Sequence, residues 1–303
     1  MPRRNLSRRE FLGASVTGAA ALTLAGCGGA GGAGGLLTTG VSTPVDTAEA
    51  PSYTLHSEVM RADGDGQTYA LDTLRGSLTQ FDPGGGTNWE LAAGTFDGPT
   101  SVSADQQGQI FVSNRGDNAI HVLDSAGRVV DERGPYGSED GAFRGARDFA
   151  VGADDRLYVA DVYNHRIQVQ APDGSTEHVF GELGAEPGSL NAPVAVAFDS
   201  YGSLHVLSAG NARIDVFDAQ GVYERSYGAH GTEVGQMRLP VDLSIGLDDR
   251  CYVVDAARSC VEVFEVAGRA PVGCFHPRTA SGDPVVPAHV NARAGDGLFI
   301  TTL

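Results

Sequence analysis

A repeat with a period of 47 residues runs through most of this 303-residue chain. Its clearest copy, residues 154–174 (DDRLYVADVYNHRIQVQAPDG), contains two short β-type runs, each followed by a turn rich in Asp, Asn, Gly or Pro. A period of this length restricts the fold to a propeller, a solenoid or another array, because one unit cannot bury its apolar face alone. One aromatic or histidine marks the second strand of each unit: Tyr69, Phe111, Tyr158, His205, Tyr252 and Phe299.

Each unit opens with the element Gly-x-[Phe/Leu/Met]-x-x-Pro and then reads as strands separated by turns. The best copies are Gly188–Pro193 with Asp199–Gly202, and Leu157–Asp161 with Asn164–Ile167. A Gly-x-x-Gly element also recurs at the same phase, at 134/137, 181/184 and 228/231. The pattern resembles the NHL repeat, and this resemblance covers about four-fifths of the chain. It implies an all-β fold, a six-bladed β-propeller with four-stranded blades that occupies residues 55–303.

The second-strand positions also predict six blades, although the first spacing is 42 residues and not 47. The last unit reads as only two strands up to Leu303. Because a closed propeller leaves few sheet edges exposed, we expect Leu36–Thr54 to supply the missing outer strands. A thin last blade is the alternative.

Two motifs near the start of the chain predict export and lipid anchoring. Ser7–Leu12 contains Arg8 and Arg9 and resembles the twin-arginine signal, and Leu24–Cys27 resembles a lipobox, in which the cysteine thiol is acylated. The resemblance implies a signal peptide over residues 1–27 and a protein tethered by Cys27 to the extracytoplasmic side of a membrane, either in the periplasm or on the cell surface. A secreted, unlipidated protein is the alternative. Residues 28–54 then begin with a Gly-rich tether.

The charge of the chain excludes a nucleic-acid partner. The net charge is −17, and cleavage before Cys27 would remove four arginines and one glutamate and leave −20. A nucleic-acid-binding protein needs a basic face. The partners that the sequence predicts are a membrane, through the lipid anchor, and an unidentified protein or small-molecule ligand.

Candidate site residues follow from propeller geometry, because residues of one phase converge on the central channel. Asp148 and Asp242 share a phase with His289, and Arg147 lies beside Asp148. We expect this group to bind calcium, another divalent cation, or a cationic or hydroxylated ligand. Asp161 and Asp255 end second strands and complete the candidate rim, although such residues more often cap a turn or pair with a nearby arginine.

The function that the sequence favours is a binding or scaffolding module, and no catalytic residue can be named. HExxH, SxxK, GxSxG and CxxC motifs are absent from the sequence. The alternative is an extracytoplasmic lyase or hydrolase with a metal-assisted site at the channel mouth, because some NHL propellers resemble the peptidyl-hydroxyglycine amidating lyase. His289 alone does not make a three-ligand zinc site. Cys260 and Cys274 fall on neighbouring predicted strands, where they either pair or serve as buried apolar residues.

Overall fold

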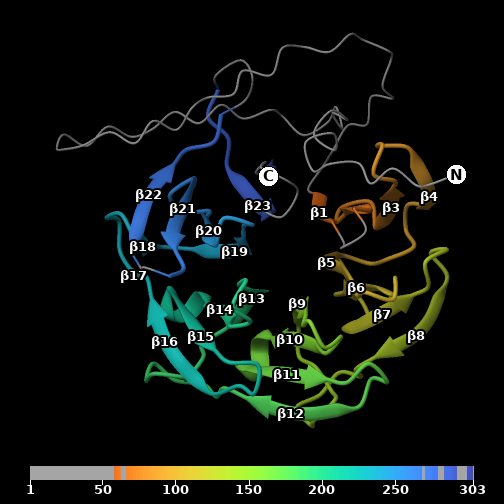
Figure 1. The fold of residues 1–303 in the computed structure, drawn as a ribbon, viewed down its shortest axis with the longest axis horizontal. Helices are drawn as coiled ribbons and strands as arrows, with labels where there is room; N and C mark the ends of the chain where they lie inside the picture. The colour runs from red at the N-terminus through yellow and green to blue at the C-terminus, as the bar shows by residue number, and fades with distance from the viewer. Residues whose placement is uncertain (1–57, 63–65, 268–269, 279–282, 292–298, 303) are drawn as a thin grey trace, which may run out of the picture.

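The computed structural model describes residues 58–62, 66–267, 270–278, 283–291 and 299–302 (Figure 1). In this part of the chain, β-sheets follow one another around a central axis as the blades of a propeller. The predictions for residues 1–54, which include the export signal, Cys27, the tether and the closing strands in Leu36–Thr54, lie outside the described residues.

Five sheets have four antiparallel strands each, and the order of the strands across each sheet is their order in the chain. The first three blades are β1 (Glu58–Ala62), β2 (Thr68–Asp72), β3 (Ser77–Phe81) and β4 (Thr87–Leu91); β5 (Pro99–Ala104), β6 (Ile110–Asn114), β7 (Ala119–Leu123) and β8 (Val129–Arg133); and β9 (Ala146–Val151), β10 (Leu157–Asp161), β11 (Arg166–Gln170) and β12 (Thr176–Phe180). The next two are β13 (Pro193–Phe198), β14 (Leu204–Ser208), β15 (Arg213–Phe217) and β16 (Tyr223–Tyr227); and β19 (Pro240–Ile245), β20 (Arg250–Asp255), β21 (Cys260–Glu265) and β22 (Pro271–Phe275).

The prediction of six four-stranded blades is wrong for the described residues, which form five. The sixth unit is a two-stranded sheet of β23 (Pro287–Asn291) and β24 (Phe299–Thr302). Its inner strand β23 contacts both β19 and β1, so it fills the place between the fifth blade and the first. The repeat counts inner and second strands, whereas a four-stranded blade also needs an outer hairpin, and the second-strand positions carry no information about that hairpin.

The inner strands start where the sequence places them. Pro99, Pro193, Pro240 and Pro287 each open an inner strand, and Ala146 opens that of the third blade. Proline has no N–H group to donate to the ladder, so within a sheet it is confined to positions such as the first residue of a strand. In each of these five strands the register shifts by one residue immediately after the start, which is a β-bulge.

The core lies between neighbouring blades. Each second strand packs on both faces, so β6, β10 and β14 are buried along their whole length and do not alternate. The aromatic residues of one blade contact the next, as in the Tyr158–Phe198 pair, with ring centroids 4.8 Å apart, and the Phe111–Phe149 pair, at 6.3 Å. The second-strand position that revealed the repeat is therefore the interblade packing position.

The Gly-x-x-Gly element and the Gly-x-[Phe/Leu/Met] element of the repeat pack together in the loop before an inner strand. Gly134 has a φ of +86°, and a Cβ atom there would lie 2.1 Å from the ring of Phe143, the apolar residue of the Gly-x-[Phe/Leu/Met] element. Tyr136 and Phe143 form a parallel bridge, and the corresponding loops form the Leu183–Leu190 bridge and the short parallel pair β17 (Ala229–His230) and β18 (Gln236–Met237). The loop that leads into each of these blades thus folds back on itself.

Candidate binding face and channel mouth

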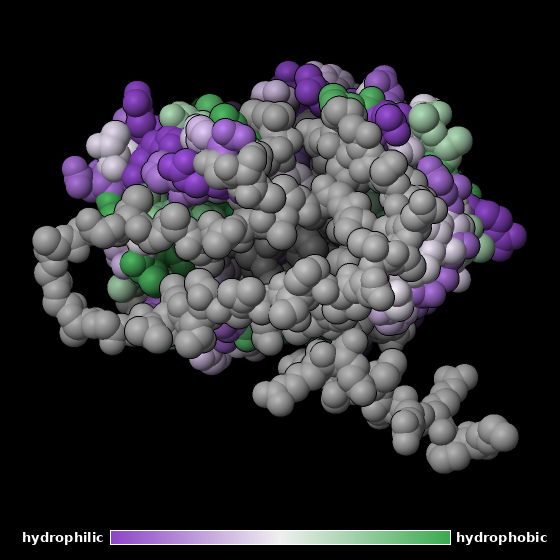
Figure 2. Space-filling model, turned by 90° about the horizontal axis from the view of Figure 1, so that it is seen from above, coloured by the Kyte–Doolittle hydropathy of each residue, from purple (hydrophilic) through white to green (hydrophobic). Residues whose placement is uncertain are grey.

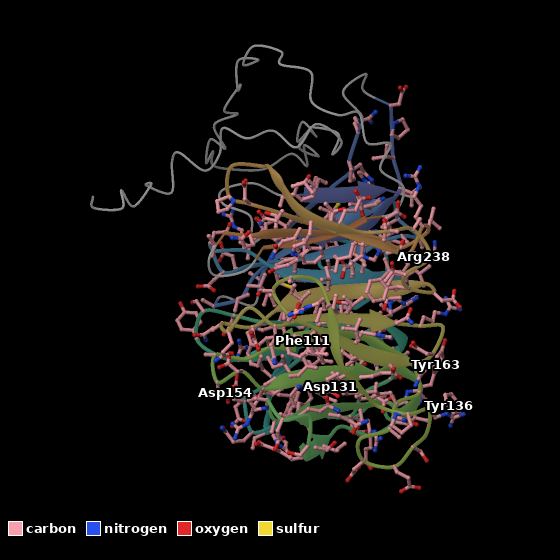
Figure 3. All side chains as sticks on the ribbon, turned by 90° about the vertical axis from the view of Figure 1, so that its right-hand side faces the viewer. Phe111, Asp131, Tyr136, Asp154, Tyr163 and Arg238 are labelled. Atoms are coloured by element: carbon pink, nitrogen blue, oxygen red, sulfur yellow. The ribbon has the colours of Figure 1, made fainter. Side chains whose placement is uncertain are left out.

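One face of the propeller carries the loops where binding is expected. We call it the mouth face and define it by the loops that lead into the inner strands and by the turns between second and third strands: residues 92–98, 134–145, 181–192 and 228–239, and residues 73–76, 115–118, 162–165, 209–212 and 256–259. Figure 3 shows this face at the right, where Tyr136, Tyr163 and Arg238 lie, and the opposite face at the left, where Asp154 lies.

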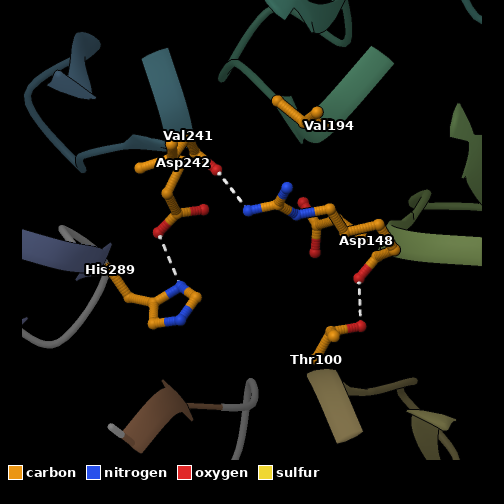
Figure 4. Close-up of a pocket in the computed structure, with 7 residues that line it drawn as sticks. Thr100, Asp148, Val194, Val241, Asp242 and His289 are labelled. Atoms are coloured by element: carbon orange, nitrogen blue, oxygen red, sulfur yellow. Dashed lines mark hydrogen bonds and ion pairs between the residues drawn. The ribbon is translucent and has the colours of Figure 1, made fainter. Parts of the chain in front are cut away.

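The β-bulges bring the predicted residues together at the channel. A bulge inserts one extra residue into a strand. Here the extra residue is the second residue of the inner strand, and in four of these strands it lines the channel: Thr100, Arg147, Val194 and Val241. Asp148, Asp242 and His289 hold the position that follows it. Figure 4 shows the result, a small pocket lined by residues that we call the mouth cluster: Thr100, Arg147, Asp148, Val194, Val241, Asp242 and His289.

Asp148 connects three consecutive blades. It is buried, with a relative exposure of 5%. Its Oδ1 accepts a hydrogen bond from Ser101 Oγ (2.6 Å) in the second blade, and its Oδ2 accepts one from the Val196 N–H (2.9 Å) in the fourth. Asp242 repeats the second contact two blades further on, because its Oδ2 accepts from the Val290 N–H (2.8 Å). Both carboxylates therefore serve contacts between blades.

Arg147 crosses the channel. Its Nη2 donates to the carbonyl oxygen of Val241 (3.2 Å), which belongs to an inner strand two blades away (Figure 4). A guanidinium keeps its charge at any physiological pH, so the cluster already contains one fixed positive charge between two aspartates. His289 completes the group, with Nδ1 3.5 Å from Asp242 Oδ2, a distance that permits an ion pair but is long for a hydrogen bond.

The mouth cluster differs from an ordinary metal site. Calcium takes six to eight oxygen ligands. Among the residues that the structure describes, Asp148, Asp242 and His289 do not form a group with all ligand atoms within 4.8 Å of one another. The divalent cation expected here stays a prediction, and Arg147 would compete with it for the same carboxylates.

Asp161 and Asp255 stand apart from the mouth cluster and hold the loops of the mouth face. Asp161 is fully buried; its Oδ1 accepts from the Arg144 N–H (2.7 Å), and its Oδ2 accepts from Arg166 Nε (2.9 Å). Asp255 accepts from the Arg238 N–H (2.7 Å), and Arg238 precedes Asp255 by 17 residues, as Arg144 precedes Asp161. The same contact occurs in two other blades: Asn114 accepts from the Asp97 N–H, and Ser208 from the Asn191 N–H.

The residues that sequence reasoning missed are exposed apolar side chains on the mouth face. Tyr136, Tyr163 and Leu183 have relative exposures of 68%, 70% and 64%. The Arg144 guanidinium lies over the Tyr136 ring, with its Cζ 5.7 Å from the centroid, and its Nε donates to the tyrosine hydroxyl (3.3 Å). The available signal was a large apolar residue within a loop, where small or polar turn residues are expected.

In the view of Figure 2, hydrophilic side chains predominate among the coloured residues, and hydrophobic ones occur in small groups. None of the helical segments in the described part of the chain combines the length and the apolar composition that crossing a bilayer requires.

Comparison with known proteins agrees with this architecture. Residues 143–169 match the family model of the NHL repeat. Among solved structures, a streptogramin B lyase is 16% identical with a TM-score of 0.58, over 81% of this chain and 76% of that chain. A catalytically inactive virginiamycin B lyase from Staphylococcus aureus, solved with quinupristin, is 13% identical with a TM-score of 0.59, over 84% and 80% of the two chains.

A third similar structure is a nidogen/laminin complex, which is 19% identical with a TM-score of 0.57, over 72% of this chain and 79% of that chain. At these identities the likeness concerns the fold alone. Comparison with curated proteins finds no match. The chain thus contains an NHL repeat and folds as a β-propeller of four-stranded antiparallel blades.

Proposed function

We propose that this protein is a membrane-anchored, extracytoplasmic β-propeller that binds a partner protein through its mouth face. The observation that carries the proposal is the set of exposed tyrosine and leucine side chains there, above all Tyr163, which is 70% exposed. Tyrosine and arginine are enriched at the centres of protein interfaces, because a rigid aromatic side chain buries a large area at little entropic cost. Arg144 and Tyr136 form such a pair on the same face.

The size of the channel mouth favours a protein partner over a small molecule. The pocket of the mouth cluster has a volume of about 10 Å³, close to the minimum that holds one water molecule. Pockets that hold drug-sized ligands usually measure about 300–1,000 Å³. The two aspartates of the cluster are also engaged in contacts between blades. A partner that rests on the loops needs neither a deep pocket nor free carboxylates.

Photo-crosslinking at two tyrosines tests the binding face. The photoreactive residue p-benzoylphenylalanine is placed at Tyr163 and, as a matched control, at Tyr201, which is 73% exposed in the turn before β14, on the opposite face. Irradiation of cells should give a discrete cross-linked product from position 163 and none from position 201. With the partner identified by mass spectrometry and purified, Tyr163→Ser should weaken binding at least tenfold, and Tyr201→Ser should leave it unchanged. Equal cross-linking from both positions would refute the proposal.

The anchor is tested separately, at Cys27. Cell fractionation should find the wild-type protein with membranes and the Cys27→Ser variant in the soluble extracytoplasmic fraction. Arg8→Lys/Arg9→Lys should leave the unprocessed chain in the cytoplasm. A Cys27→Ser variant as membrane-bound as wild type would contradict the anchor and would leave the binding face untouched.

A lyase with its site at the mouth is a second candidate, favoured by the position of His289 beside Asp242 and by the nearby Arg147 guanidinium. In such a site His289 would remove a proton, and Arg147 would stabilise the negative charge that develops on the substrate. Incubation with quinupristin, with and without a divalent cation, tests this idea. Chromatography should show consumption of the compound by wild type and none by His289→Ala, and an unchanged compound in all samples would exclude this substrate.

A further inference from the structure

Two cysteines and a glutamate meet between the outer strands of the fifth blade, away from the mouth cluster. Glu262 on β21 lies directly opposite Cys274 on β22, and Cys260 precedes Glu262 by two residues on the same face of β21. Their ligand atoms, Cys260 Sγ, Cys274 Sγ and a carboxylate oxygen of Glu262, all lie within 4.8 Å of one another. Cys260 and Glu262 are fully buried, and Cys274 is partly exposed.

The repeat does not require a cysteine at this position. The corresponding first residue of the third strand is Arg166 in the third blade and Arg213 in the fourth. Each of those guanidinium groups donates to a carbonyl of the preceding loop: Arg166 to Ala142 O (3.1 Å), and Arg213 to Ser189 O (3.0 Å).

In the fifth blade the arginine comes from a different position. Arg258, two residues before Cys260, donates to Gln236 O, which is the carbonyl of the same phase in that blade. Arg258 thus makes the contact with the loop that Arg166 and Arg213 make in the other two blades, and Cys260 is not needed for it. The fold therefore leaves its thiol free to face Glu262 and Cys274.

We propose that Cys260, Cys274 and Glu262 form a binding site for a thiophilic cation, Zn²⁺ in the first place. Cysteine thiolates and glutamate carboxylates are both ligands that zinc takes in proteins, with Zn–S distances of about 2.3 Å. In tetrahedral geometry such bonds hold two sulfurs about 3.8 Å apart, a separation within the 4.8 Å limit observed here. The partly exposed side of Cys274 leaves access for water as a fourth ligand.

The surroundings hold the ligands in place and balance their charge. Glu262 Oε2 accepts a hydrogen bond from the Gly235 N–H (3.0 Å), and Oε1 pairs with Arg258. Arg258 Nη2 also lies 3.9 Å from Cys274 Sγ. Binding would displace the guanidinium from Oε1, while its bond to Gln236 O keeps a positive charge beside the thiolates. Groups that hydrogen-bond to metal ligands in this way hold the ligands in orientation.

Coordination at this site releases protons and involves no redox step. Each thiol loses its proton to solvent as its sulfur binds the cation. Metal affinity should therefore fall steeply as the pH is lowered.

A direct disulfide is the competing outcome, and the strand register disfavours it. Cys260 and Cys274 are diagonal and not directly opposite, since Cys274 pairs with Glu262. Diagonal neighbours in an antiparallel sheet are about 7–8 Å apart, whereas disulfides join Cα atoms about 4.4–6.8 Å apart. A metal ion spans the larger separation without moving the backbone.

Cadmium titration of the reduced full-length chain tests the site, with Cys27→Ser in every sample so that the thiol of Cys27 does not contribute. We expect one Cd²⁺ per chain, with thiolate-to-metal charge-transfer absorption, competition by Zn²⁺ and a raised melting temperature. Cys260→Ser and Cys274→Ser should each weaken binding at least 100-fold, and Glu262→Gln about 10–100-fold. Cys251→Ala is the matched control, because Cys251 is a buried cysteine on β20 outside the group, and should bind as wild type does.

Alkylation of the wild-type chain keeps the test decisive if a variant fails to fold. Stoichiometric Zn²⁺ should protect Cys274, the partly exposed cysteine of the group, from iodoacetamide, as measured by peptide mass spectrometry. The proposal would be overturned by the absence of a charge-transfer band in fully reduced protein, by wild-type affinity in Cys260→Ser, or by a Cys260–Cys274 disulfide that re-forms in the presence of zinc.

Discussion

Replacing His205 with phenylalanine should make the stability of this protein less sensitive to acid. His205 occupies the second-strand position that holds Phe111 and Tyr158 in other blades, so phenylalanine fits the repeat. The imidazole is fully buried; its Nδ1 lies 2.8 Å from the Tyr227 hydroxyl, and its Nε2 lies 3.1 Å from Asp199 Oδ2. Burial lowers the pKa of His205 below 6.5, against the opposing effect of the Asp199 carboxylate.

The size and sign of the effect follow from linkage. The unfolded chain binds a proton at His205 with a pKa of about 6.5, whereas the folded chain binds it only at lower pH. Acidification below pH 6.5 therefore favours the unfolded state. Between pH 7.5 and 5.5, His205 lowers the free energy of unfolding by at most about 1.4 kcal/mol. This limit is reached if the imidazole of the folded chain stays neutral throughout. That corresponds to about 3–6 °C in melting temperature.

In the wild-type protein Asp199 does not contribute to the change in stability between pH 7.5 and 5.5. Burial tends to raise the pKa of its carboxyl, but the hydrogen bonds from His205 and Ser203 outweigh it, and the pKa is lowered from 3.8. The carboxylate thus stays ionised in the folded chain from pH 5.5 to 7.5. The substitution carries a separate cost at all pH values, about 1–3 kcal/mol, because the Tyr227 hydroxyl and Asp199 each lose a partner.

Urea denaturation of both proteins at pH 7.5, 6.5 and 5.5 measures the effect. The variant should start less stable and lose less stability on acidification, so the difference between the two proteins shrinks toward pH 5.5. The other seven histidines are the same in both proteins, so their contribution cancels in the comparison. His230→Asn, an exposed site, is the control and should follow wild type. Parallel curves for wild type and His205→Phe would refute the reasoning, because they would show that pairing of protonated His205 with Asp199 offsets its burial.

Three further predictions concern the fold and the mouth cluster. Asp161→Ala should lower the free energy of unfolding by about 3–5 kcal/mol in urea denaturation, because it leaves Arg166 without its buried partner; a loss below 1 kcal/mol would contradict this. Gly134→Ala should lower the free energy of unfolding by roughly 2–4 kcal/mol, because alanine disfavours the left-handed backbone and its Cβ atom must displace the Phe143 ring. Urea denaturation measures this loss, and unchanged stability would show that the loop adapts freely. Millimolar calcium should raise the melting temperature of Arg147→Met more than that of wild type, because the channel guanidinium no longer competes for the carboxylates; equal shifts would remove the case for a cation there.

The sequence by itself determined the units of this propeller and the places where strands begin and face one another. Strand positions, and the buried second-strand position of Tyr158 and His205, recur every 47 residues along the chain. The period of the sequence is therefore enough to predict them. It also placed Asp148, Asp242 and His289 at one phase, and the structure lines the channel mouth with all three.

What the tertiary structure decided depends on contacts between units, which no period records. Only the three-dimensional arrangement shows that Arg147 spans the channel to Val241, an inner-strand residue two blades away. The structure alone also shows that Arg258 takes over a contact made by Arg213 in the fourth blade. The two arginines hold different positions in the repeat, but they donate to equivalent carbonyl groups, those of Gln236 and Ser189. A repeat fixes which residues are equivalent, whereas the geometry of the ring fixes which side chains from different units meet.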